Sequence, residues 1–161
     1  MVIVMMGVSG SGKTTVGSCL AQQLGWEFAD ADDYHPAVSV EKMRQGVPLT
    51  DADRLPRLKS LRSLIAGWLT TERNGVLACS ALKQTYREKL RVDQRVHFVY
   101  LKAEHDLLSQ RLRARRDHYM KEQMLASQLA TLEEPKHAIA VNAGDTPQQI
   151  AQEIRQLLKL A

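Results

Sequence analysis

The sequence is poor in the residues that define several classes of protein. Only two of its 161 residues are cysteine, Cys19 and Cys79, which are too few for a disulfide framework and form no metal-ligand pair. Aromatic residues make up 5% of the chain and do not alternate with a basic stripe, as they do in many nucleic-acid-binding proteins. No apolar run approaches the length of a membrane-spanning helix. We therefore expect a protein of the reducing cytoplasm that binds neither nucleic acid nor a membrane.

The composition is otherwise that of an ordinary globular protein, with 44% hydrophobic and 25% charged residues. A chain of 161 residues can form one α/β domain with a sizeable core, but not a second full domain. We expect a single domain over residues 1–161.

A phosphate-binding pattern follows the first apolar run of the chain. Gly7, four further residues and then Gly12-Lys13-Thr14 give the P-loop spacing, between a strand-like run and a helix-forming segment. That context disfavours the alternative, a Gly/Ser linker that matches by accident. Lys13 can reach the β- and γ-phosphates, and the Thr14 hydroxyl can ligate Mg²⁺. We expect ATP and Mg²⁺ to bind here, with contacts from Gly7, Val8, Ser9, Gly10, Ser11, Gly12, Lys13, Thr14 and Thr15.

Segments with strand and helix periodicity alternate along the chain. We expect strands at 2–4, 26–30, 76–79, 96–101 and 138–141. We expect helices at 15–24, 39–45, 50–71, 81–91, 104–113, 120–132 and 147–160. Thr50 and Thr146 are the expected N-caps of two of these helices. The alternation predicts an α/β fold with a five-stranded parallel sheet and helices on both faces.

Acidic residues follow the second predicted strand. In an open parallel sheet they would face the ligand crevice at the carboxyl ends of the strands. Asp32 could orient or deprotonate an acceptor hydroxyl in line with the γ-phosphate, and Asp30 could bind a water on Mg²⁺. The alternative is a solvated turn.

Basic residues could complete a phosphoryl-transfer site. Lys83 and Arg87 are one helical turn apart and could share a face toward the crevice, or they could simply be solvated. A second group of positive charge consists of Arg111, Arg113, Arg115 and Arg116. We interpret residues from about 114 to 124 as a small lid over ATP, with a solvated basic helix end as the alternative.

Several segments beyond the P-loop resemble the gluconokinase family of small P-loop kinases. The most specific are Asp30-Ala31-Asp32-Asp33-Tyr34-His35-Pro36 and Cys79-Ser80-Ala81-Leu82-Lys83 with Tyr86-Arg87. Leu49-Thr50-Asp51-Ala52-Asp53-Arg54 and His118-Tyr119-Met120 with Ser127-Gln128 match as well. The resemblance covers the chain from Met6 to about Pro135.

This resemblance implies ATP-dependent phosphorylation of D-gluconate to 6-phospho-D-gluconate, on a fold similar to shikimate and adenylate kinases, commonly as a homodimer. It implies catalytic roles for Lys13, Asp32 and Arg115, with Arg111 and Arg115 also contacting the nucleotide. The substrate contacts it implies are Asp32, His35, Arg54, Lys83, Arg87, His118 and Gln128. A sugar acid needs cationic groups for its carboxylate and an acid for the reacting hydroxyl, which agrees with this set.

Two positions depart from the family pattern. Arg57 stands where the family often has Trp after Pro56, and Asn142-Ala143 replaces a more usual acidic stretch near the expected adenine loop.

Other functions remain possible on the sequence alone. One alternative is a kinase for another small molecule, of the shikimate or nucleotide type. Another is a non-catalytic nucleotide-binding switch. GTP switches of that kind need an Asn-Lys-x-Asp string and an Asp-x-x-Gly string, and neither occurs in this sequence.

Overall fold

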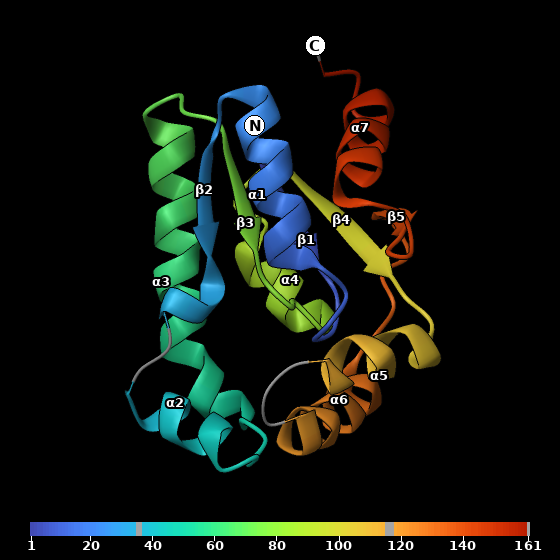
Figure 1. Ribbon diagram of the computed structural model, residues 1–161. Helices are drawn as coiled ribbons and strands as arrows, with labels where there is room; N and C mark the ends of the chain where they lie inside the picture. The colour runs from blue at the N-terminus through green and yellow to red at the C-terminus, as the bar shows by residue number, and fades with distance from the viewer. Residues whose placement is uncertain (35–36, 115–117, 161) are drawn as a thin grey trace.

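The computed structural model describes residues 1–34, 37–114 and 118–160 (Figure 1). Its strands are β1 (Val2–Met6), β2 (Glu27–Asp30), β3 (Gly75–Ala78), β4 (Val96–Lys102) and β5 (Ile139–Asn142). Its helices are α1 (Lys13–Leu24), the short 3₁₀ helix η1 (Ala31–Tyr34), α2 (Ala37–Arg44), α3 (Asp51–Thr70), α4 (Gln84–Leu90), α5 (His105–Arg113), α6 (His118–Thr131) and α7 (Pro147–Leu157).

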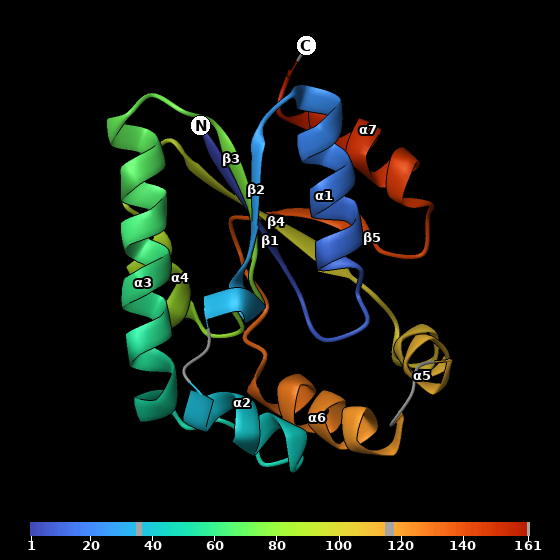
Figure 2. The ribbon, with the colours of Figure 1, turned by 60° about the vertical axis from the view of Figure 1, so that its left-hand side comes forward.

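The five strands form one sheet in the order β2-β3-β1-β4-β5, and every pair is parallel. This is the predicted sheet. The first strand is central, with β3 on one side and β4 on the other, so the chain leaves the sheet at a switch point and enters the P-loop there. All strands end on the side of the sheet where η1, α2, α5 and α6 lie, and both termini lie at the opposite end (Figures 1 and 2).

Side chains of β1 alternate between two hydrophobic clusters, one on each face of the sheet. Ile3 and Met5 belong to the cluster under α1 and α7, whereas Val2, Val4 and Met6 belong to the cluster under α3 and α4. All five side chains are fully buried. A central strand buried on both faces reads as a continuous apolar run, which is why the sequence identified it correctly.

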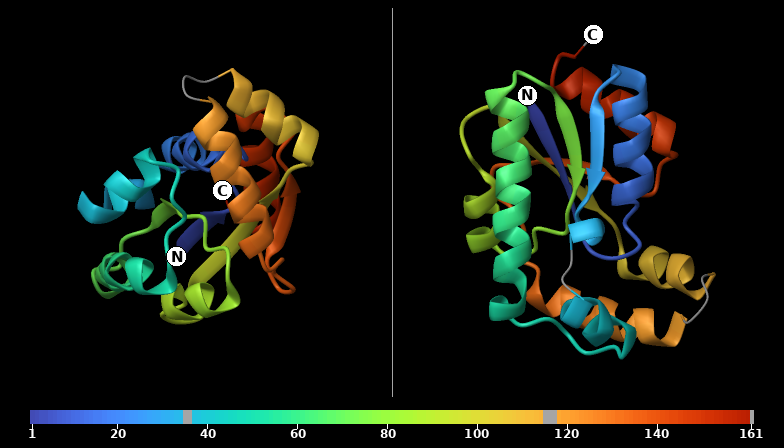
Figure 3. Two further views of the ribbon diagram at one scale, coloured as in Figure 1. Left: turned by 90° about the horizontal axis from the view of Figure 1, so that it is seen from below. Right: turned by 90° about the vertical axis from the view of Figure 1, so that its left-hand side faces the viewer.

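A third, smaller cluster lies at the carboxyl ends of the strands and fixes the surroundings of the P-loop. Its members are Val8, Leu82, Leu108, Leu112 and Leu125. They join the loop to α5 and α6, the gold and orange helices that lie below the sheet in the right-hand view of Figure 3. This packing holds the lower helices against the phosphate loop.

Most element boundaries agree with the sequence to within a few residues, and both predicted caps are present. Thr50 and Thr146 each form a reciprocal capping box with the third residue of their helix. Two boundaries differ by three residues: α7 ends at Leu157 instead of residue 160, and α4 begins at Gln84 instead of residue 81. Ala81 has a left-handed φ of 46°, so a regular helix cannot begin there. Among the described residues, no helix is long and apolar enough to cross a membrane.

Candidate active site

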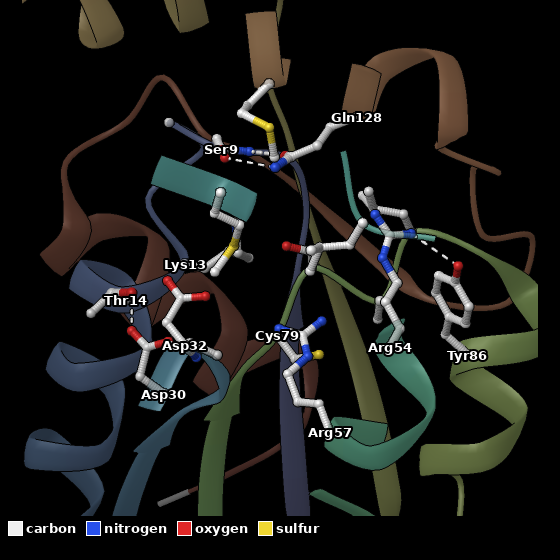
Figure 4. Close-up of a pocket in the computed structure, with 18 of the residues that line it drawn as sticks. Ser9, Lys13, Thr14, Asp30, Asp32, Arg54, Arg57, Cys79, Tyr86 and Gln128 are labelled. Atoms are coloured by element: carbon white, nitrogen blue, oxygen red, sulfur yellow. Dashed lines mark hydrogen bonds between the residues drawn. The ribbon is translucent and has the colours of Figure 1, made fainter. Parts of the chain in front are cut away.

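A cavity of about 490 Å³ opens at the carboxyl ends of the strands. The P-loop, η1, α3 and the residues after β3 line most of it, and α6 contributes Met124 and Gln128. In the close-up, Lys13, Thr14 and Asp32 lie at one side and Arg54 and Tyr86 at the other (Figure 4). The cavity therefore has a phosphate-loop side and an arginine side.

The P-loop backbone leaves room for an anion. Gly12, immediately before α1, has a φ of 100°, and no side chain caps the helix there. The first N–H groups of α1 are therefore open to a phosphate. Gly7 also needs to be glycine, since a Cβ there would lie 2.8 Å from Ser11 Oγ and 3.0 Å from Leu101 O. These features fit the predicted binding of a nucleoside triphosphate.

The side chains of the loop are held by local contacts. Lys13 Nζ donates to Val8 O at 3.1 Å, so the ammonium group lies over the loop. Gln128 forms two hydrogen bonds with Ser9, accepting from its backbone N at 2.6 Å and donating to its hydroxyl at 2.9 Å. The predicted site residue Gln128 thus lies in the cavity, but against the P-loop. Thr15 lines the cavity, whereas the Val8 side chain is buried in the third cluster.

The two predicted metal-site residues contact each other. The Thr14 hydroxyl donates to Asp30 Oδ2 at 2.6 Å, and Asp30 Oδ1 accepts from the backbone N of Asp32 at 2.9 Å. One carboxylate thereby orients both the threonine and the turn that carries Asp32. The described residues contain no group of three or more His, Cys, Asp and Glu side chains that could hold a metal. A hydroxyl and one carboxylate suit Mg²⁺, which keeps several waters and binds substrate phosphates.

On the arginine side, Arg54 is part of a polar network. Arg54 Nη1 donates to the Tyr86 hydroxyl at 2.9 Å, and Tyr86 donates a short hydrogen bond to Asp51. Lys83 Nζ also donates to Asp51, at 3.1 Å. The hydrogen bonds from Tyr86 and Lys83 hold the pKa of Asp51 below its usual value, and burial together with the bond to Asp51 raises the pKa of Tyr86. Asp51 is therefore an ionised anchor for this side of the cavity.

Arg57 and Cys79 line the cavity between these two sides (Figure 4). Only 8% of Arg57 is exposed, and Cys79 is 1% exposed. Burial raises the pKa of the Cys79 thiol, so the thiol is uncharged. The sequence marked Arg57 only as a departure from a family pattern. Its spacing of three residues from Arg54 on one helix was the signal that both face the same way.

Arg111 connects two loops of the nucleotide side. Its Nη1 donates to Gly10 O at 3.0 Å and to Ser11 O at 3.2 Å, and its Nη2 donates to Ala143 O at 2.6 Å. The predicted nucleotide-contacting arginine thus lies beside the P-loop, and it also reaches the loop that follows β5.

Arg87, which we predicted to bind substrate, is not among the described residues that line the cavity. It is 3% exposed, and its guanidinium donates to Ala81 O at 2.7 Å and to Glu133 O at 2.8 Å. The predicted shared face with Lys83 does not form, because Lys83 is the N-cap of α4 and has an extended backbone. Lys83 does reach Asp51 at the edge of the arginine side. Arg87 instead joins the loop before α4 to the loop after α6.

Three predicted site residues cannot be placed. His35 and Arg115 lie outside the described residues, as does part of the predicted lid at 114–124. The backbone of His118 begins α6, but its side chain is not among those described.

A P-loop after the central strand of a parallel sheet, next to a cavity that carries two acids and two arginines, is typical of a small-molecule P-loop kinase. The comparisons with known proteins agree. A family model described as an AAA domain matches residues 2–135. The gluconokinase of Gluconobacter oxydans (strain 621H) is 44% identical over 156 residues, which cover 94% of this chain and 88% of that protein.

Solved structures extend the comparison. The crystal structure of a gluconokinase from Sinorhizobium meliloti 1021 is 38% identical, with a TM-score of 0.83, over 94% of this chain and 87% of that one. A shikimate kinase from Bacteroides thetaiotaomicron, 20% identical with a TM-score of 0.68 over 99% of both chains, shares the fold alone. The protein belongs to the gluconokinase family.

Proposed function

We propose that the protein transfers the γ-phosphoryl group of ATP to D-gluconate, giving 6-phospho-D-gluconate and ADP. The observation that carries the proposal is the two-sided cavity, in which Arg54 lies across from the P-loop and Asp32. A sugar acid carries a carboxylate and several hydroxyls, so it can meet a cation at one end and an acid at the other. The relatives named gluconokinase support the same substrate.

The nucleotide side holds and orients phosphate. The N–H groups of the P-loop and of the first turn of α1, together with Lys13, bind the phosphate oxygens of ATP. Thr14 and Asp30 hold Mg²⁺, which when bound neutralises charge on the phosphates. Arg111 keeps the P-loop at a fixed position relative to the loop after β5.

The acceptor side positions one hydroxyl. Arg54 binds the carboxylate of gluconate, and Asp32 accepts or orients the proton of the hydroxyl that attacks phosphorus. The bond between Asp30 and the Asp32 backbone fixes the turn from which that carboxylate projects. We also propose substrate contacts for His35 and His118, phosphate contacts for Arg115, and a homodimer in the cytoplasm.

The test is a substrate panel with coupled detection of ADP, at saturating ATP and Mg²⁺. Gluconate should support turnover, while shikimate, nucleoside monophosphates and water should not, since an incompletely filled site leaves the reacting groups unassembled. Equal ADP release with and without gluconate would contradict a kinase, and faster turnover of another acceptor would reassign the substrate. Omission of Mg²⁺ tests the metal, and size-exclusion chromatography tests the homodimer.

A further inference from the structure

Gln128 of α6 holds one residue of the P-loop by both ends of its side-chain amide. Its Oε1 accepts from the backbone N of Ser9 at 2.6 Å, and its Nε2 donates to the Ser9 hydroxyl at 2.9 Å (Figure 4). A backbone N–H can only donate, so the amide oxygen must face it and the amide nitrogen must face the hydroxyl. Gln128 and Ser9 both line the cavity. The contact therefore joins α6 to the phosphate loop inside the proposed site.

The peptide group between Val8 and Ser9 is held from its other side as well. Val8 O accepts from Lys13 Nζ at 3.1 Å and from Ser11 N at 3.2 Å. The C=O and N–H of a trans peptide lie in one plane and point in opposite directions, so the bond between Ser9 N and Gln128 also helps to fix the direction of Val8 O. Lys13 is the residue expected to reach the β- and γ-phosphates, and its ammonium group contacts this peptide. Ser9 therefore lies at the part of the loop where the terminal phosphate is expected.

The contact with Gln128 leaves the Ser9 hydroxyl a donor. Because this hydroxyl accepts from Nε2 of the amide, it keeps its own proton to donate to another group. Hydrogen bonds to an ionised oxygen, such as that of a phosphate, are roughly twice as strong as those between neutral groups. A carboxylate in place of the amide would itself take the serine proton. An amide at position 128 therefore suits a serine that donates to phosphate.

We propose that Gln128 is a positioning residue for the nucleotide, which orients Ser9 so that its hydroxyl donates to an oxygen of the terminal phosphate of ATP. This inference rests on the proposed function for the use of ATP, and not for the identity of the acceptor. It places Gln128 on the nucleotide side of the site, whereas the family resemblance implied a contact with the acceptor. ADP lacks the terminal phosphate, so its affinity should not depend on Gln128.

The experiment compares wild type, Gln128→Leu, Gln128→Glu and Ser9→Ala, with Gln110→Leu at an exposed position of α5 as the control. Calorimetry with Mg²⁺ and without gluconate measures the Kd of ADP and of AMPPNP, a non-hydrolysable ATP analogue that keeps a terminal phosphate. Gln128→Leu should raise the Kd of AMPPNP about 3- to 30-fold and leave the Kd of ADP within about twofold. Gln128→Glu should raise the Kd of AMPPNP further, because a carboxylate takes the serine proton and repels the phosphate. Gln110→Leu should match wild type.

A double-mutant cycle tests whether Gln128 acts through Ser9. If it does, Gln128→Leu should raise the Kd of AMPPNP much less in the Ser9→Ala protein than in wild type. Coupled kinetics should show a higher KM for ATP in Gln128→Leu, with the KM for gluconate within about twofold of wild type. A purely structural role would not produce this difference between the two substrates.

An unchanged Kd of AMPPNP in folded Gln128→Leu would overturn the inference. Equal losses of affinity for ADP and AMPPNP would overturn it too, and so would independent effects of Ser9 and Gln128 in the cycle. A rise in the KM for gluconate alone would return Gln128 to the acceptor side. If Gln128→Leu fails to fold, Gln128→Glu and Ser9→Ala decide by the same Kd measurements.

Failure of the proposed function would be recognised separately. Wild-type protein that phosphorylates a different acceptor would refute gluconate as the substrate, while the nucleotide Kd series would still test Gln128. Wild-type protein that binds neither AMPPNP nor ADP would refute both.

Discussion

Arg54 is held against Tyr86 by two contacts at once. Its Nη1 lies 2.9 Å from the Tyr86 hydroxyl, and its guanidinium carbon lies 5.3 Å from the centre of the Tyr86 ring. Since Tyr86 in turn donates to Asp51, the hydroxyl fixes a rotamer of Arg54 that a long, flexible side chain would otherwise leave often. Tyr86 is thus a positioning residue for Arg54.

The first prediction concerns that hydroxyl. Tyr86→Phe keeps the ring but removes the acceptor for Arg54, so the KM for gluconate should rise about 2- to 10-fold, the worth of one hydrogen bond. The value of kcat and the KM for ATP should change little. Tyr100→Phe, which removes a hydroxyl bonded to Glu134 instead, is the matched control. An equal loss in both variants would indicate a general effect of the substitution on the fold.

Lys13→Met should abolish turnover and leave the fold intact, because we expect Lys13 to bind the phosphates, and its ammonium group lies over the loop, where it donates to Val8 O. Steady-state kinetics and circular dichroism on the same sample measure both. Lys136→Met, at an exposed site, is the control. Near-normal activity at saturating ATP would contradict the P-loop assignment.

Asp32→Asn keeps the shape of the side chain and loses its charge. If the carboxylate takes or orients the acceptor proton, kcat should fall by about 10²- to 10⁴-fold while ATP affinity stays nearly constant. Paired turnover and calorimetric measurements separate these effects. A fall in kcat below about threefold would remove Asp32 from the chemistry, and a large loss of affinity for Mg²⁺-ATP would move it to the metal.

Arg87→Met should affect stability more than catalysis. It leaves Ala81 O and Glu133 O without their donor, which should lower the free energy of unfolding by about 1–3 kcal/mol in urea titrations. The KM for gluconate should not change in the folded enzyme. Lys89→Met, exposed on the same helix, is the control. A selective rise in the KM would restore Arg87 to the substrate site.

The acid dependence of stability should depend partly on Asp53. The hydrogen bond from Lys42, with those from Thr50, lowers the pKa of Asp53 from 3.8 to about 2. A lowered folded-state pKa stabilises the fold above the unfolded-state value, and this contribution is lost as the pH falls from about 4 to about 2. In urea titrations, Asp53→Asn should lose less stability over this range than wild type. The control is Asp145→Asn, and identical slopes in all three proteins would refute the assignment.

Local patterns allowed the sequence to predict the sheet, the P-loop and the N-caps Thr50 and Thr146. Contacts between distant segments were not accessible in the same way. Gly75, for example, lay outside the strand expected at 76–79, yet it begins β3, where a Cβ would lie 2.4 Å from Trp68 Cε3. That close approach joins residues on two different elements, so no local pattern could reveal it.

For the site as well, some residues could be predicted from local sequence, whereas the contacts of others required the fold. Lys13 and Thr14 could be predicted from motif spacing and Asp30 from its place at the end of a strand, and the structure brings Thr14 and Asp30 together. The shared face predicted for Lys83 and Arg87 did not form, because the helix starts only at Gln84. In contrast, the contact between Gln128 and Ser9 joins residues 119 positions apart, so its geometry required the fold.

Arg54 and Arg57, the two arginines that line the cavity, come from a single helix whose two ends are fixed independently of the cavity. The Thr50 capping box fixes its start, and Trp68 packs over Gly75 near its end. The P-loop and Arg111 belong to other segments of the chain. New acceptor preferences can therefore arise in evolution, or in a directed selection, by changes along one face of α3 that leave the handling of ATP intact. A library of variants confined to that face of α3 should change the acceptor specificity and leave ATP binding unchanged.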